Sequence, residues 1–99
     1  MLLLLIYVII LVGDIMSKKE KLFKKLLSRP SDFTFKEAES LLGHFGYYIA
    51  KTGKTSGSRV SFTDGKGDYI RLHKPHPRNT LKLYQLDDIV TALSERGLL

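Results

Sequence analysis

The period of the apolar residues changes at Gly46, and this change constrains the fold more than any other feature of the sequence. Before Gly46, apolar residues recur at helical spacing in two stretches, 17–28 and 34–44, which predicts two amphipathic helices. After Gly46 the sequence becomes rich in branched and aromatic residues in short alternating runs, which predicts β-strands. These runs occupy residues 47–51, 58–63 and 68–73.

The helical period returns at residue 83 and runs towards Gly97, a residue suited to stop a helix. Thr34 and Glu37 have the spacing of a capping box, which predicts a helix start at residue 34. The Asp-Gly turn in 64–67 is short enough to join antiparallel strands. We therefore expect an α+β fold of order α-α-β-β-β-α, in which helices pack on one face of a three-stranded antiparallel meander.

Size and charge narrow the functional classes. The chain has 99 residues, enough for one small domain, and a formal net charge of +6. A basic surface of this kind suits nucleic acid, an anionic membrane surface or an acidic protein. The chain has no cysteine, which excludes disulfide scaffolds and thiolate zinc sites.

The first residues form an apolar leader. Every residue from Leu2 to Val12 is apolar, but a helix of this length spans only about 17 Å of the roughly 30 Å hydrocarbon layer. Asp14 prevents its extension, because a carboxylate in lipid is costly. An export signal would need a basic segment before the apolar run and a small-residue cleavage site after it, and neither is present.

A second methionine, Met16, precedes SKKEKLFKKLL, which is typical of the start of a soluble bacterial protein. We expect translation to begin at Met16 rather than Met1, so that residues 1–15 are a leader outside the native protein or an exposed segment, and 16–99 form the single functional domain. Two alternatives stay open: an interfacial or partner-binding segment, and export. No stable membrane partner is expected.

The segment 71–78 carries the strongest chemical signal. Two prolines restrict its backbone, and polyproline geometry would aim His73 and His76 the same way, about 9 Å apart, so that they flank a phosphodiester. Imidazole can accept or donate a proton near neutral pH, so these two histidines are the candidate catalytic residues. Three cations of the segment would stabilise phosphate charge: Arg71, Lys74 and Arg78. The alternative is a rigid surface loop without a chemical role.

Two histidines without cysteine or well-placed carboxylates are too few ligands for zinc, so no metal or other cofactor is expected. A second cluster, 51–59, combines glycines, hydroxyls and cations, which suits contact with phosphate oxygens. Its candidate RNA-binding residues are Lys51, Lys54, Ser58 and Arg59. A polar hairpin is the alternative interpretation.

Three stretches together carry a resemblance to a known family: TFKEAESLLGHFGYYIAKTGKTSGSRVSF, YIRLHKPHP and LKLYQLDDIVTAL. Through them, residues 34–96 resemble the HicA family of bacterial toxin ribonucleases. The resemblance implies a fold similar to the double-stranded-RNA-binding domain and metal-independent cleavage of messenger RNA in the cytoplasm. It also implies restraint by a partner antitoxin of the HicB family.

One position departs from the family pattern. The family's usual catalytic histidine directly follows Gly-Ser, and here that place is taken by Arg59, which cannot act as a general base. We expect His73 to be the general base and His76 the acid or a phosphate contact. Arg59, Lys54 and Lys74 would stabilise charge. Two other functions stay open: an RNA-binding module without catalysis, and a basic interaction domain that docks an acidic protein.

Overall fold

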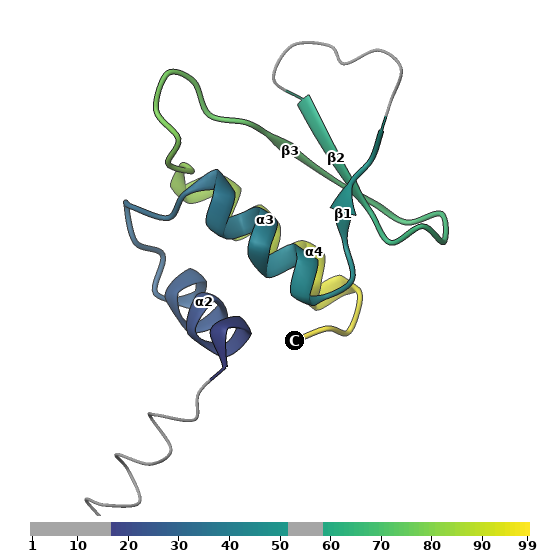
Figure 1. Ribbon diagram of the computed structural model, residues 1–99. Coiled ribbons are helices and arrows are strands. Elements are labelled where there is room, and N and C mark those ends of the chain that lie inside the picture. The colour runs from purple at the N-terminus through teal and green to yellow at the C-terminus, as the bar shows by residue number, and fades with distance from the viewer. Residues whose placement is uncertain (1–16, 52–58) are drawn as a thin grey trace, which may run out of the picture.

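Helices and strands follow one another in the expected order α-α-β-β-β-α (Figure 1). The computed structural model describes residues 17–51 and 59–99, so the leader 1–15 and the 52–58 segment lie outside the described residues. The described helices are α2 (Lys18–Leu27), α3 (Phe35–His44) and α4 (Leu83–Glu95), and the described strands are β1 (Tyr48–Ile49), β2 (Arg59–Thr63) and β3 (Tyr69–His73). The α+β prediction is confirmed.

The strands form one antiparallel sheet in the order β1-β2-β3, which confirms the meander. The first strand is shorter than the 47–51 expected from sequence. Tyr47 is buried, and its amide donates to the Leu42 carbonyl oxygen at 2.9 Å. This residue therefore caps the C-terminal end of α3 instead of pairing in the sheet. Pairing continues for one residue beyond β1, because the Ala50 amide donates to the Ser61 carbonyl oxygen at 2.8 Å.

Local side-chain chemistry explains where α3 begins and ends. The Thr34 hydroxyl accepts from the Glu37 amide at 3.0 Å, and a Glu37 carboxylate oxygen accepts from the Thr34 amide at 3.0 Å. This reciprocal arrangement is the predicted capping box. The helix ends at His44, and Gly46 follows with φ +90°, a conformation that glycine adopts without steric cost.

The core lies between the helices and one face of the sheet. In Figure 1, α3 passes in front of α4, and α2 lies on the side of these two helices that is away from the strands. The Phe35 and Phe62 rings join α3 to the central strand, with centroids 6.0 Å apart. The most deeply buried apolar side chains come from all three helices, β2 and the loop before α3: Leu26, Phe33, Ala38, Leu41, Leu42, Phe62, Leu86, Ile89 and Leu93.

A polar cluster ties the β2–β3 turn to the end of α4. The Arg96 guanidinium donates to the two Asp68 carboxylate oxygens at 2.6 and 3.1 Å, and the Tyr47 hydroxyl donates to the same carboxylate. Arg96 also donates to the Tyr69 carbonyl oxygen at 3.2 Å. The start of β3 is therefore anchored to α4. Among the described residues, no helix is long and apolar enough to cross a membrane.

Candidate functional site

Arg59 and His73 are direct partners across the β2–β3 ladder. Residues opposite each other in an antiparallel pair lie on the same face of the sheet, with Cβ atoms about 4.5–5.5 Å apart. Both side chains are exposed, whereas the neighbouring pair Val60 and Leu72 points to the helices. One described residue of each candidate cluster, Arg59 and His73, therefore lies at the same end of the sheet.

We call this side of the sheet the open face, because no described helix packs on it. Strand alternation and the register place seven residues there: Tyr48, Arg59, Ser61, Thr63, Tyr69, Arg71 and His73. Arg71 lies opposite Ser61, next to the Arg59–His73 pair. A phosphate near His73 would thus meet two guanidinium groups.

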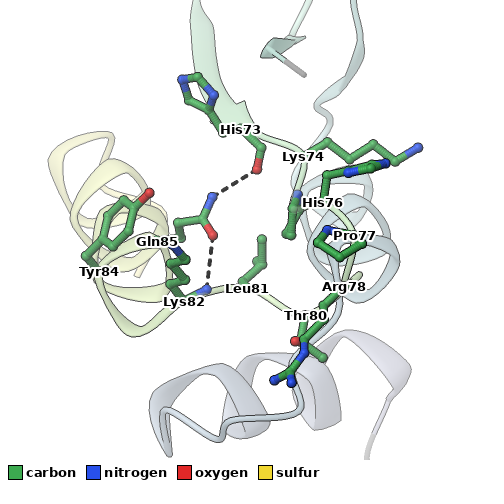
Figure 2. A pocket seen from close by; sticks show the side chains of 11 residues that line it. His73, Lys74, His76, Pro77, Arg78, Thr80, Leu81, Lys82, Tyr84 and Gln85 are labelled. Atoms are coloured by element: carbon green, nitrogen blue, oxygen red, sulfur yellow. Dashed lines mark hydrogen bonds between the residues drawn. The ribbon is translucent and has the colours of Figure 1, made fainter. Parts of the chain in front are cut away.

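The loop after β3 borders an open pocket of about 520 Å³ (Figure 2). The pocket is lined by residues of the loop and of the first turn of α4: His73, Lys74, Pro75, His76, Pro77, Arg78, Thr80, Leu81, Lys82, Tyr84 and Gln85. Its wall contains both candidate catalytic histidines and two of the candidate cations.

The two histidines do not point the same way, so the sequence-based expectation of a common direction is wrong. In Figure 2, His73 extends to the side of Tyr84, whereas His76 extends to the opposite side with Lys74. The reason is that His73 is the last residue of β3, where strand alternation fixes it on the open face. The Lys74 ammonium lies 5.7 Å from the centroid of the Phe35 ring, which directs this side chain towards the start of α3.

Gln85 fixes the position of the His73 main chain. Its side-chain nitrogen donates to the His73 carbonyl oxygen at 2.9 Å, and its side-chain oxygen accepts from the Lys82 amide at 3.0 Å (Figure 2). Gln85 is only 5% exposed. This residue was missed in the sequence, although its spacing from Ile89 and Leu93 places it on the buried stripe of α4.

The far end of the loop is held by the main chain. The Phe35 amide donates to the Asn79 carbonyl oxygen at 2.8 Å, and the Leu81 amide donates to the Phe33 carbonyl oxygen at 2.7 Å. Gln85 secures one end of the loop and these two bonds secure the other. The loop is therefore held on the fold from both sides.

Within the described residues, no ion pair neutralises the positive charge at the site. The ion pairs of the described residues use the cations Lys25, Arg29 and Arg96, none of which is a candidate site residue. No ion pair of the described part involves the described site cations, which are Lys51, Arg59, Arg71, Lys74 and Arg78. These charges remain available to an external anion.

Two predicted site residues, Lys54 and Ser58, lie outside the described residues. Lys51 is exposed just after β1, and Arg78 is exposed in the loop. Within residues 17–51 and 59–99, no group of three or more His, Asp or Glu side chains is placed to hold a metal ion.

Comparison with known proteins gave one family. Residues 35–95 match the family model of the HicA toxin of bacterial toxin-antitoxin systems, which covers more than half of the chain. No curated protein and no solved structure matches the chain. Helix α2 precedes the matched range, whereas all strands and α4 fall within it.

Proposed function

The chain belongs to the HicA family of bacterial toxins, and from this membership we propose that it is an endoribonuclease that cleaves messenger RNA without a metal ion. We assign the activity to the single domain of residues 16–99 and place it in the bacterial cytoplasm. The uncompensated cations at the end of the sheet support an RNA substrate, because phosphate contacts dominate the affinity of nucleic-acid binding.

The register of His73 with Arg59 carries this proposal. Arg59 takes the place that follows Gly-Ser, where the family resemblance puts a catalytic histidine. Because the Cβ atoms of a cross-strand pair are about 5 Å apart, an imidazole at position 73 reaches nearly the same space above the open face. This proximity supports the proposal that His73 supplies the base that Arg59 cannot supply.

The proposed reaction uses the ribose 2′-hydroxyl as nucleophile. His73 accepts its proton, the 2′-oxygen bonds to the adjacent phosphorus, and the bond from phosphorus to the 5′-oxygen breaks. The products are a 2′,3′-cyclic phosphate and a 5′-hydroxyl, whose proton comes from solvent. Arg59 would hold the phosphate by a bidentate contact, a geometry that lysine does not offer.

We assign His76 a phosphate contact rather than the role of the acid. Its side chain extends to the opposite side of the loop from His73 (Figure 2), so one phosphorus would not lie between the two rings. Together with Lys74 and Arg78, it would bind the backbone of a flanking nucleotide. Lys54, from the 51–59 cluster, is the remaining proposed charge stabiliser.

Cleavage of a single-stranded RNA by the purified full chain tests this function. With a chelator present, we expect products that end in a cyclic phosphate and a 5′-hydroxyl. We expect no cleavage of the same sequence as DNA or with 2′-O-methyl groups, because both lack the nucleophile. An unmodified RNA that stays intact, or a 2′-O-methyl RNA that is cut, would contradict the proposal.

A second candidate is an RNA-binding module without catalysis, which the arginine at position 59 favours. Such a module would bind RNA with an affinity that falls steeply with salt, and would leave the RNA intact. Mass analysis of the RNA after binding distinguishes the two candidates.

We further propose that a HicB-like antitoxin is the protein partner. The uncompensated cations of the site and the loop after β3 are where an antitoxin would block RNA most directly. Expression of the chain in a bacterium should arrest growth, and expression of the neighbouring gene should relieve the arrest. Growth arrest that the neighbour does not change would contradict this partner.

A further inference from the structure

Two exposed tyrosines flank the central strand on the open face. Tyr48 of β1 and Tyr69 of β3 both pair with Thr63 of β2, so the three side chains form one row across the sheet. Both tyrosine residues are more than half exposed, whereas Thr63 is 7% exposed although no described helix covers it. The tyrosines therefore cover Thr63 and present aromatic surface to solvent.

The main chain of Tyr69 is anchored, and the β2–β3 turn leaves room for the Tyr48 ring. Arg96 donates to the Tyr69 carbonyl oxygen, which fixes the start of β3. A Cβ atom at Gly65 would lie 2.8 Å from the Tyr48 hydroxyl, so the glycine leaves room for this ring over the β2–β3 turn. Tyrosine has few rotatable side-chain bonds, so two tyrosines on paired strands lose little conformational freedom when a ligand stacks on them.

Positive charge continues from this aromatic row towards His73. Arg71 and His73 follow Tyr69 on the same face of β3, each about 6.6 Å further along the strand. The seven residues of the open face include two arginines and no carboxylate. Arg71 also borders a shallow groove with Asp88 and Glu95 of α4, but it forms no ion pair with either in the described part.

We propose that the open face is a stacking platform for single-stranded RNA, in which Tyr48 and Tyr69 each hold one unpaired base and Arg71 holds the backbone between them and His73. Unpaired bases stack on exposed aromatic rings of a sheet, whereas the bases of a duplex hide their faces in their own stack. Exposed rings can stack on the unpaired bases of a single RNA strand, and the nearby cations that form no ion pair in the described part can bind its phosphates. This inference rests on the proposed function for the identity of the ligand as RNA.

Binding of a 2′-O-methyl oligouridylate to the full chain tests the platform without cleavage. We expect Tyr48→Leu and Tyr69→Leu each to weaken binding about 5- to 150-fold at low salt, the range that loss of one stacked base gives. The matched variants Tyr48→Phe and Tyr69→Phe keep the ring and should bind within about twofold of the parent. Thermal melting of each variant checks that the fold is retained.

A spectroscopic readout separates stacking from general attraction. The chain has no tryptophan, so its intrinsic fluorescence comes from tyrosine. The oligonucleotide should quench this emission in the parent, and the quenching should fall in each Leu variant. A duplex RNA of the same length should compete less well than the single strand.

Three results would overturn the platform: unchanged affinity in both Leu variants, no binding by the parent, or Leu variants that lose the antitoxin but keep RNA. The last result would assign the face to the protein partner. Failure of the proposed function is a different result, because the parent would then bind the oligonucleotide through the tyrosines but leave unmodified RNA intact. Conversely, a parent that cleaves RNA with a KM unaffected by the Leu substitutions refutes the platform alone.

Discussion

Arg59 and His73 face each other across the β2–β3 ladder, on the side of the sheet that no described helix covers. In the proposed mechanism, the arginine would supply charge but no base, and the histidine would supply the base from the adjacent strand. The resemblance to the HicA family implies that the base would be a histidine directly after Gly-Ser, which is the position of Arg59 in this chain. The register therefore supports the proposal that the base comes from the strand next to position 59.

Restoring a histidine at position 59 tests this relationship. Arg59→His would place a second imidazole opposite His73, and we expect single-turnover cleavage to become at least about 10-fold faster, within the usual gain from a positioned base. Arg59→Lys keeps the charge without adding a base, so it should not accelerate cleavage. A slower reaction in Arg59→His than in Arg59→Lys would show that position 59 serves only phosphate binding.

The Gln85 side chain should matter for both stability and cleavage. Gln85→Leu leaves the His73 carbonyl and the Lys82 amide without their partner, so we expect the free energy of unfolding to fall by about 1–3 kcal/mol. Cleavage should lose kcat more than KM, because the loop would position His73 less well. Urea unfolding and steady-state cleavage measure the two effects.

An exposed residue of the same helix provides the control for Gln85. Ser94→Ala should change the free energy of unfolding by less than about 0.5 kcal/mol and leave cleavage unchanged. If Gln85→Leu behaved like Ser94→Ala, its hydrogen bonds would not position the loop.

Stability should decline in acid because of Asp68. The Arg96 guanidinium, and after it the Tyr47 hydroxyl, hold the pKa of this carboxyl at about 2, below its ordinary value of 3.8. The charged form therefore stabilises the fold fully above pH 4, and this contribution is lost as the pH falls from about 4 to about 2. Urea midpoints measured across this range should fall less steeply in Asp68→Asn than in the parent, and an equal slope would refute the assignment. Asp88→Asn, at an exposed site, is the control.

The same cluster predicts a loss of stability in strong alkali. The hydrogen bond to Asp68, together with burial, raises the pKa of the Tyr47 hydroxyl above 10.0, because the neutral form is the better donor. This contribution is present below pH 10 and is lost as the pH rises through the folded pKa. Tyr47→Phe should remove this alkaline loss, as measured by the same urea midpoints.

The capping box of α3 should contribute measurably to stability. Thr34→Ala removes the hydroxyl that accepts from the Glu37 amide, so we expect the free energy of unfolding to fall by about 1 kcal/mol. Thr34→Ser keeps the acceptor and should restore most of this loss. Equal stability of the Ala and Ser variants in urea would show that the hydrogen bond has no net effect.

Local signals in the sequence were sufficient to predict the order of elements. The Thr34 and Glu37 spacing, the turn at 64–67 and the alternation of Ile70 and Leu72 each depend on neighbours in the chain, and each prediction is confirmed. The start of the first strand was less well predicted. Tyr47 has strong β propensity, but its ring is buried and its amide bonds to the end of α3.

The site depends on contacts that local patterns do not encode. The sequence indicated that Arg59 and His73 are relevant residues, but only the register shows that they are opposite each other. The prediction that His73 and His76 point in the same direction was wrong. His73 is the last residue of β3, so strand alternation rather than polyproline geometry sets its direction. The hydrogen bond from Gln85 to the His73 main chain joins α4 to β3. No sequence motif predicts such a contact.

The central claim is that His73 is the general base, and single-turnover cleavage of an unmodified RNA by the full chain tests it most directly. His73→Ala should lower the rate by at least about 10²-fold, the lower end for loss of a general base. His44→Ala is the matched control, because His44 is exposed at the end of α3, and its rate should stay within about twofold of the parent. Equal rates for the parent, His44→Ala and His73→Ala would contradict the account.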